Sequence, residues 1–396
     1  MRILFMTQVL PFPLDAGPKV RAHYVLRYLA EAGHEVSLLT FIRPGEPAAY
    51  VEPLRRICRR VETVPMVRSR GRDLRDGLRS VGTNLPFLLV RDQLPAMWDR
   101  LKWMLRERSF DALHADQLWM APYAMNGVSP GLTVLDQHNA VFMVPRRMAE
   151  RHRSRVARLL LRHEAVKLQA FEREACQRFA RVVWVTEEDR EAVLPHAGGV
   201  GARHSVIPIA ADPDAQAPVE RRRPFRVTFV GGLHWPPNSE GVSWFVENAW
   251  PQVARANPSA VLTIVGKAGR IGLRAPGSAE RVELTGYVPD LRTILSETSV
   301  FIVPLLAGAG MRVKILDAWC WGLPIVSTTI GAEGLDARHS ENLLLADEPG
   351  VFAAAVTSVF QDGRLASGLA EGGRATVEGK YHWRRVYQAW DRVYPS

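Results

Sequence analysis

The residues that most clearly suggest chemistry lie in the stretch GAGMRVKILDAWCWGLPIVSTTIGAEG, at 308–334. Two glycines come just before Arg312 and Lys314, and an apolar run follows. The free N–H groups and the dipole at the N-terminus of a helix attract anions, whereas cations placed there without an anion oppose the dipole. The stretch therefore predicts a phosphate-binding site at the start of a helix over 312–321.

The sequence around this stretch alternates between strands and helices. Strands are expected at 226–232, 260–266, 282–286, 299–305 and 324–329, with helices around 240–256, 290–296 and 312–321. Such alternation is typical of a parallel sheet with helices on both faces. Ligands of these sheets bind beyond the carboxyl ends of the strands, which is where the glycine-rich stretch begins.

The first half of the chain shows the same alternation. Strands are expected at 2–7, 35–41, 111–115, 132–140, 181–186 and 204–210, with a helix from Pro18 to about Ala32. A long helix carries an apolar stripe from Leu161 to Phe179, which is expected to face a core. The polar, proline-rich stretch 211–224 is typical of a linker. The sequence therefore predicts two doubly wound, Rossmann-like α/β domains in tandem.

Length and composition agree with two domains of a soluble protein. The 396 residues exceed what one core normally serves, and 47% apolar with 23% charged residues is ordinary for globular chains. No membrane-spanning helix or signal peptide is expected. The three scattered cysteines, Cys58, Cys176 and Cys320, fit neither a disulfide framework nor a zinc site and favour a reducing cytosol.

The net charge of +10 comes from two segments. Residues 54–80 hold nine arginines against three acids, and residues 146–167 hold seven arginines and one lysine against two acids. One interpretation is a solvated arginine-rich surface, and the other is attraction to an anionic membrane or a polyanionic acceptor. Nucleic acid is not expected as a partner, because the basic segments lack interleaved aromatic residues and a recognition motif.

Other cofactor and metal motifs are missing from the sequence. The first strand-to-helix turns of the two halves, MTQVLPFPLDAG and VGGLHWPPNSEG, do not contain Gly-x-Gly-x-x-Gly. The sequence has no Gly-Lys-Ser or Gly-Lys-Thr phosphate loop, no His-Glu-x-x-His and no Cys-x-x-Cys. Neither a cofactor nor a metal is therefore expected, and a cleft between two sheets is the expected ligand site.

The order of several segments resembles a known family. The span from FVGGLHWPPNSEGVSWFVENAWPQV through VGK, VELTGYVPDL and PLLAGAGMRVKILDAWCWGLPIVSTTIGAEGL is similar to the donor domain of the family 4 retaining glycosyltransferases, which have GT-B architecture. PFPLDAGPKVRAHYVLRYLAEAGHEVSLLTF is similar to the start of their acceptor domain. LDQHNA, FEREACQRFARVVWVTEEDREAV and YHWRRVYQAW have counterparts as well.

This resemblance covers nearly the whole chain and implies a domain plan and an activity. It implies an acceptor domain at 1–210, the linker at 211–224, a donor domain at 225–377 and a C-terminal helix at 378–396 that packs back toward the first domain. The implied enzyme is metal-independent and moves a sugar, with retention, from a nucleotide-diphosphate sugar to a hydroxyl acceptor. The resemblance is to the branch acting in envelope polysaccharide and glycolipid synthesis. The cysteines favour a cytoplasmic enzyme, and if the acceptor is lipid-linked, the two arginine-rich segments are expected to hold it on the inner face of the membrane.

The resemblance also implies roles around the opening stretch. Arg312 and Lys314 would meet the diphosphate, and the backbone of Ala309, Gly310 and Met311 would approach the donor. Asp317 takes the place of the second Glu in the family pattern of Glu, seven residues, Glu, and would accept hydrogen bonds from the ribose. The first Glu of the pattern falls on Ala309, so the chain departs from the family there. The alternative for Asp317 is an ion pair with Lys314 on the helix surface.

Further residues are implied at other loops of the two domains. Those on the donor side are Gly17, Gly232, Asn238, Lys267, Tyr287, Val288 and Glu333. On the acceptor side, Arg21 would lie in the first turn of its helix and Asn139 would orient His138, the expected active-site histidine. No side chain suggests a nucleophile, which fits a front-face displacement in which the leaving phosphate takes the acceptor proton.

Three other interpretations stay open at this point. A nucleotide-sugar epimerase shares the two-domain architecture, and a transferase could instead glycosylate a small-molecule natural product. An inactive, glycan-binding relative is suggested by Ala309 in place of a carboxylate. The acceptor is therefore a glycan, a lipid-linked sugar or a small molecule.

Overall fold

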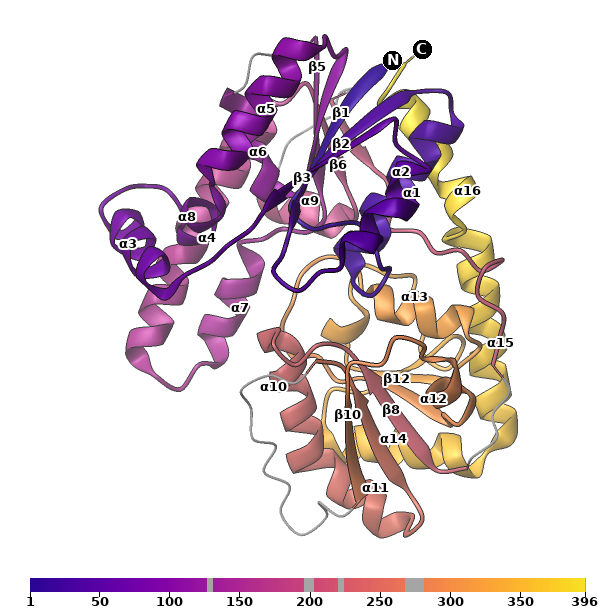
Figure 1. Cartoon of the computed structure of the whole chain (residues 1–396). Coiled ribbons are helices and arrows are strands. Elements are labelled where there is room, and N and C mark those ends of the chain that lie inside the picture. Colours follow the sequence, from indigo (N-terminus) through magenta and orange to yellow (C-terminus); the bar gives the residue numbers. More distant parts are fainter. Residues whose placement is uncertain (127–130, 196–202, 220–223, 268–280, 396) are drawn as a thin grey trace. The chain divides into compact units, whose positions relative to one another are not determined.

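A computed structural model describes residues 1–126, 131–195, 203–219, 224–267 and 281–395. The chain divides into two compact units, Met1–Ala210 with Trp383–Ser396, and Ala211–His382 (Figure 1). Within the described residues, no helix combines the length and the apolar character needed to cross a membrane. Each unit is a parallel sheet covered by helices, which confirms the predicted fold class.

The first unit is built on seven parallel strands in the order β3-β2-β1-β4-β5-β6-β7. Their bounds are β1 (Arg2–Thr7), β2 (Glu35–Ile42), β3 (Arg60–Pro65), β4 (Ala112–Asp116), β5 (Leu132–Gln137), β6 (Arg181–Trp184) and β7 (His204–Val206). The order reverses between β1 and β4, so the loops after these two strands diverge and leave room for a ligand at the carboxyl edge. The predicted strands at 2–7, 111–115 and 181–186 lie on β1, β4 and β6, and β3 was not predicted.

The first unit contains more helices than the two that were predicted, which correspond to α1 and α8. The helices of this unit are α1 (Gly17–Glu31), α2 (Glu52–Arg55), α3 (Arg70–Val81), α4 (Phe87–Asp92), α5 (Pro95–Glu107), α6 (Ala121–Asn126), α7 (Met143–Arg151), α8 (Arg155–Arg178), α9 (Glu187–Val193) and α16 (Trp383–Val386). The stripe predicted on the long helix is buried from Ala165 onward. The N-terminal half of α8 is largely exposed, and so is the apolar side of α3.

The second unit has six parallel strands in the order β10-β9-β8-β11-β12-β13. They are β8 (Arg226–Val230), β9 (Val261–Val265), β10 (Val282–Gly286), β11 (Val300–Val303), β12 (Ile325–Ser327) and β13 (Leu344–Leu345). The helices are α10 (Pro236–Trp244), α11 (Trp250–Ala256), α12 (Arg292–Ser296), α13 (Val313–Cys320), α14 (Pro349–Gln361) and α15 (Gly363–Lys380). A π-helical turn, Phe245–Ala249, joins α10 to α11 just before Pro251, which cannot donate a helical hydrogen bond.

The end of the chain belongs to the first unit. Trp383 packs against Tyr24 with 5.5 Å between ring centroids, and the Arg27 guanidinium lies 4.4 Å from the Trp383 ring. The Tyr394 hydroxyl lies 2.6 Å from Nδ1 of His114. Burial of these aromatic rings on α1 and β4 gives the C-terminal segment a large share of its binding energy.

The described part of the expected linker, 211–219, belongs to the second unit and is hydrogen-bonded within it. The Ala211 N–H donates to the Tyr381 carbonyl, and the Val219 N–H donates to the Trp321 carbonyl. Arg374 donates to the carbonyls of Pro213 and Gln216 at 3.0 and 2.8 Å. Residues 220–223 of the expected linker lie outside the described residues.

Candidate active site

The centre of the second unit's site is the point where its strand order reverses, between β8 and β11. These strands are neighbours in the sheet although they are not consecutive in the sequence. Because they are parallel, the loops after them lie at the same edge. The loop after β8 carries Gly231 and Gly232 and leads into α10, whose first turn holds Asn238, and the loop after β11 carries the glycine-rich stretch that leads into α13. The topology therefore brings together two of the segments that the sequence suggested for donor binding.

Lys314 joins the two loops. Its Nζ donates to Oδ1 of Asn238 at 3.0 Å, and Nδ2 of Asn238 donates to the Gly232 carbonyl at 2.9 Å. The ammonium also lies 4.3 Å from the centre of the Phe229 ring. Burial, and next the charge of Arg312, lowers the pKa of Lys314 to about 7. No contact of this ammonium with a described residue is to an acidic group, and a bound diphosphate would supply that negative charge.

A glycine leaves the space around the Lys314 ammonium open. A Cβ at Gly231 would lie 2.8 Å from Nζ of Lys314 and 2.9 Å from Nδ2 of Asn238. Any side chain at this position would displace these groups. The absence of a side chain therefore allows the backbone after β8 to approach both the lysine and a ligand.

The Arg312 side chain is hydrogen-bonded to the backbone of the glycine-rich loop. The residue is 7% exposed, and its guanidinium donates to the carbonyls of Ala309 and Gly310, each at 2.7 Å, and to that of Ile330 at 3.2 Å. A carboxylate oxygen of Glu333 lies 3.8 Å from Nη2. Gly310 has φ of +74°, in the region that favours glycine. In this conformation Arg312 shapes the loop, and its predicted contact with the diphosphate stays a prediction.

Asp317 lies one turn further along α13, and its partner is Gln216. Burial raises the pKa of Asp317 to about 7, and a hydrogen bond from the Gln216 side chain opposes that rise. Lys314 donates to Asn238 instead, so the alternative of a surface ion pair between Lys314 and Asp317 does not describe the structure. The role of Asp317 toward a ribose stays a prediction.

The remaining donor-side residues follow other strands of the same sheet. Lys267 follows β9 and is exposed, and its carbonyl accepts a hydrogen bond from the Leu233 N–H at 3.0 Å. Tyr287 and Val288 follow β10, and Tyr287 is half exposed. Because all strands are parallel, these residues lie along the carboxyl edge that holds Lys314. Met311 is buried beside Arg312 in the loop after β11.

In the first unit, a buried network surrounds His138 at the end of β5. Nε2 of His138 lies 3.0 Å from Oδ1 of Asp116 and 3.6 Å from Oδ2 of Asp136. Asp116 ends β4 and pairs with Asp136 in the parallel register, which explains why both carboxylates reach the same ring. Asp116 therefore orients His138, a role that the sequence analysis had assigned to Asn139.

The carboxylates keep His138 protonated at neutral pH. Burial alone would lower the pKa of His138, but Asp116 and then Asp136 raise it to about 9. Burial alone would also raise the pKa of Asp136, but the Arg21 guanidinium holds it well below its usual range. Since the pKa of His138 in the folded protein exceeds the usual 6.5, its charge stabilises the fold fully below pH 6.5 and less as pH rises through 9.

Arg21 is placed differently from the prediction. Its side chain is fully buried, with Nε at 2.8 Å from Oδ2 and Nη2 at 2.7 Å from Oδ1 of Asp136. Nη1 donates to the carbonyls of Ile207 and Pro208 at 2.8 and 3.1 Å. A guanidinium bound in this way cannot reach an acceptor, so the acceptor-side assignment of Arg21 is wrong. Gly17, at the start of α1, is half-buried four residues earlier.

His114, Asp116 and Asp136 also bring possible metal-ligand atoms within 4.8 Å of one another. Both oxygens of Asp136 already accept hydrogen bonds from Arg21, and Asp116 accepts a hydrogen bond from His138. Burial lowers the pKa of His114 to about 3. The fixed positive charge of Arg21 opposes a second cation here, so the group does not suit a metal ion.

Two acidic residues that the sequence analysis missed hold the loop that carries His138. Oε1 of Glu172 accepts hydrogen bonds from the Val141 N–H at 2.8 Å and from the Gln137 side chain at 3.1 Å, and Oε2 accepts from the Phe142 N–H at 3.0 Å. Oδ1 of Asp189 accepts from the Ala140 N–H at 2.8 Å. Glu172 is fully buried in α8, and an acid beside an apolar stripe was the signal that could have revealed it.

Replacing Glu172 with glutamine is expected to destabilise the first unit and weaken catalysis together. The amide can accept on one side only and turns an NH₂ toward a backbone N–H, which leaves a buried donor unpaired at a cost of about 1–3 kcal/mol. Urea unfolding measures the first effect and steady-state transfer the second. Glu174→Gln is the control, because Glu174 is exposed on the same helix and pairs with Arg178. Equal stability of the two variants would contradict this role.

Comparisons with known proteins agree with both units. Residues 16–215 match the family model Glycosyltransferase Family 4, and residues 224–362 match the model Glycosyl transferases group 1. The chain therefore belongs to the family 4 glycosyltransferases, and its two parallel sheets are those of the GT-B architecture.

The chain is also similar to curated relatives and, in its fold, to solved structures. The chain is 22% identical to an uncharacterized 44.6 kDa protein in the cps region of Klebsiella pneumoniae, over 98% of each chain. It is 29% identical to the lipopolysaccharide core biosynthesis glycosyltransferase LpsE of Rhizobium meliloti (strain 1021), over 30% of this chain and 36% of the relative. Its fold is similar to that of Anabaena Alr3699/HepE in complex with UDP-glucose, with 14% identity, a TM-score of 0.66 and 98% of each chain covered.

Proposed function

We propose that the chain transfers a sugar from a nucleotide-diphosphate sugar to a hydroxyl group during synthesis of an envelope polysaccharide or glycolipid. The observation that carries the proposal is the hydrogen bond from Lys314 to Asn238 across the reversal point of the second sheet, with Asn238 in turn donating to the Gly232 carbonyl. It puts a half-buried cation beside a glycine-rich helix start, the chemistry expected of a diphosphate site. The solved complex of HepE with UDP-glucose and the activity of LpsE support the donor and product classes.

The proposed reaction proceeds with retention. The bond between the anomeric carbon and the diphosphate oxygen breaks, and the acceptor oxygen forms its bond on the same face of the sugar. The acceptor proton passes to the leaving phosphate oxygen, so no other base is needed. Lys314 and the N–H groups of the loop at 309–311 stabilise the charge that grows on the diphosphate. The anomeric configuration of the product, measured by proton NMR before it equilibrates, tests this assignment, and inversion would contradict it.

Thermal unfolding with a panel of nucleotide sugars tests the function and identifies the donor. A ligand that binds only the folded protein adds about 2.7 kcal/mol of stability when its concentration is about 100 times its Kd. The true donor should therefore raise the Tm more than the other nucleotide sugars do. Release of nucleotide with a transferred sugar in the product would support transfer. An epimerised sugar without any acceptor product would instead favour the epimerase.

Transfer is expected to continue at its full rate in excess EDTA. Lys314, and Arg312 after a change of its partners, are cations of the chain that can neutralise the diphosphate without a metal ion. The measurement is the initial rate with and without chelator, followed by addition of magnesium or manganese. A rate that collapses in EDTA and recovers with either ion would contradict metal independence.

We further propose that the acceptor is a lipid-linked sugar and that the enzyme works as a peripheral protein at the cytoplasmic face of the membrane. The support is the arginine excess of 54–80 and 146–167, both in the first unit. Each cation near an anionic leaflet contributes about 1 kcal/mol, screened beyond a Debye length of about 8 Å at physiological salt. Transfer to an extracted lipid-linked acceptor, compared with soluble sugars and small aglycones, tests the acceptor class.

A further inference from the structure

Two helices of the first unit expose leucine and valine side chains in an unusual concentration. We name the α3–α8 face after its six members, which are between 60% and 72% exposed: Leu74, Leu78, Val81, Val156, Leu159 and Leu160. Their spacing of three and four residues puts each set of three on one side of its helix. Single exposed apolar residues are normal on soluble proteins, but a cluster of this kind marks an interaction surface.

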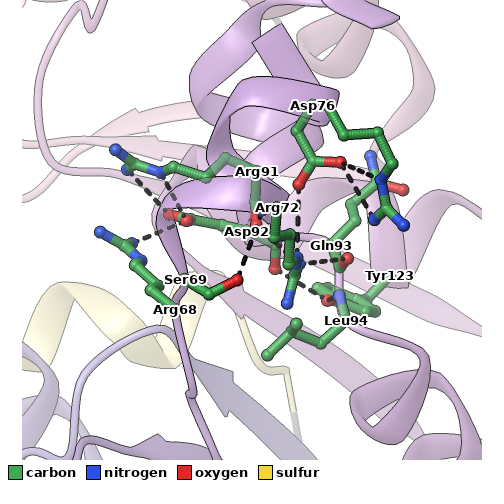
Figure 2. A network of polar contacts seen from close by, with 10 residues as sticks. Arg68, Ser69, Arg72, Asp76, Arg91, Asp92, Gln93, Leu94 and Tyr123 are labelled. Carbon is green, nitrogen blue, oxygen red and sulfur yellow. Dashed lines mark hydrogen bonds and ion pairs between the residues drawn. The ribbon is translucent and has the colours of Figure 1, made fainter.

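The orientation of α3 is set by polar contacts on its other side. Nη2 of Arg72 donates to the carbonyls of Arg91 and Gln93 at 2.8 and 3.2 Å, and its Nε donates to Asp76 at 3.3 Å (Figure 2). Asp76 is buried, whereas Leu74 and Leu78 are exposed. This arrangement reverses that of an ordinary surface helix, which buries its apolar side. Polar contacts therefore hold the apolar side of α3 outward.

Contacts between α8 and the α3–α4 segment connect the two parts of the face. The Lys167 ammonium donates to the Ser80 carbonyl, and the Glu164 carboxylate accepts from the N–H groups of Phe87 and Leu88 at 3.0 and 3.1 Å. Ser80 directly precedes Val81, so the apolar side of α3 ends beside α8. The uncovered stripe of α8 begins one to two turns away, toward its N-terminus.

The charges beside the face are positive. Arg75 and Arg79 are exposed on α3, and its two acids are half-buried or buried. Residues 151–163 contain five arginines and no acid. Exposed leucines bordered by arginines match a lipid surface, because hydrocarbon accepts the apolar side chains while lipid phosphates accept the guanidinium groups. A zwitterionic surface offers phosphates too, but it has no net negative charge to attract the arginines.

We propose that the α3–α8 face inserts into the interfacial layer of a bilayer that contains anionic lipid. The proposal deepens the proposed function and rests on it for the purpose of binding, delivery of a lipid-linked acceptor. Glu172, which holds the His138 loop, follows Leu160 by twelve residues on α8. At 1.5 Å per residue the two are about 18 Å apart along the helix. One rigid helix thus connects the inserted residues to the loop of the active-site histidine.

Flotation with vesicles tests the insertion. The proteins are wild type, Leu74→Gln with Leu78→Gln, Leu159→Gln with Leu160→Gln, and the control Val351→Gln, since Val351 is 56% exposed on α14 of the second unit. Wild type and control should float with vesicles of phosphatidylglycerol and phosphatidylcholine, and bind phosphatidylcholine alone at least tenfold less. Each double variant should lose at least tenfold in partitioning, because two leucines leave the hydrocarbon. Unchanged partitioning of both double variants overturns the proposal.

A fluorescent label measures depth directly. Cys58, Cys176 and Cys320 are buried, so a cysteine introduced by Leu160→Cys can be labelled selectively with a polarity-sensitive dye. Its emission should shift to the blue on anionic vesicles and be quenched by nitroxide lipids, while a label at Val351→Cys should not respond. A label at position 160 whose emission does not change on anionic vesicles overturns insertion. A wild-type dimer that the double variants abolish also overturns it, because the face would then bind a second copy of the chain.

Donor hydrolysis in the absence of lipid separates this proposal from the proposed function. The double variants should release nucleotide from the donor at the wild-type rate, because the face lies outside the donor-binding unit. If wild type binds vesicles but turns over no nucleotide sugar, the proposed function fails and insertion stands. If wild type turns over the donor but does not bind vesicles, insertion fails and the proposed function stands.

Discussion

Lys314→Ala is expected to lower the rate of sugar transfer at least 100-fold while the second unit stays folded. Removing one cation or hydrogen-bond donor that stabilises transition-state charge in a water-excluded site typically costs about 3–4 kcal/mol of barrier. The fold should tolerate the change, because an ammonium whose pKa is lowered to about 7 by burial contributes little to stability without its anion. Steady-state transfer and thermal unfolding measure the two effects.

Two other variants make this result specific. Lys380→Ala removes an exposed lysine of the same unit that pairs with Asp336, and it should leave transfer unchanged. Arg312→Ala should lower both transfer and Tm, because three backbone carbonyls of buried loops lose their donor. If Lys314→Ala transferred sugar at the wild-type rate, the assignment of the diphosphate to this site would be wrong.

Donor affinity should also depend on pH through Lys314. Bound diphosphate favours the charged ammonium, so binding takes up a proton once the pH exceeds about 7, the pKa without donor. The Kd of the donor should therefore rise by up to tenfold per pH unit above 7. Calorimetry in buffers of different ionisation enthalpy measures the proton uptake, and Lys314→Ala should abolish it.

His138→Ala is expected to lower transfer by about 100- to 1,000-fold, the range typical of removing one donor that stabilises charge in the transition state. The His138 ring is protonated at neutral pH because Asp116 and Asp136 raise its pKa to about 9. Transfer by wild type should thus fall as pH rises through 9. Rates from pH 6 to 10 and the Tm over the same range measure the activity and the fold separately.

Asp116→Asn is the matched test of the charge on His138. It keeps the shape of the side chain that lies 3.0 Å from Nε2 but removes the largest contribution that raises the pKa of His138. The alkaline fall in activity should move to lower pH, while His138→Ala should show no such fall. A profile of Asp116→Asn identical to that of wild type would show that the titrating group is not His138.

Local patterns in the sequence are sufficient for most of the strands, the two-unit plan and the start of α13, but not for β3 or β13. Parallel strands are buried on both faces, so RILFMT, RVTFV and VFIV read as apolar runs without further information. Glycine at 308 and 310 followed by two cations suggested an anion site, because backbone freedom and charge are properties of the residues themselves. The parallel order of the strands then follows from the intervening helices.

The partners of each charged side chain depended on contacts between segments far apart in the chain. Arg21 was expected near an acceptor, but β5 places Asp136 beside it and the guanidinium is buried there. Asp116 rather than Asn139 orients His138, because β4 and β5 are neighbours in register. Leu74, Leu78 and Val81 have the spacing of one side of an amphipathic helix, but only the tertiary structure shows that this side of α3 faces outward. Residue type specifies what a side chain can do, whereas the packing of distant strands and helices decides which partner it meets and whether water reaches it.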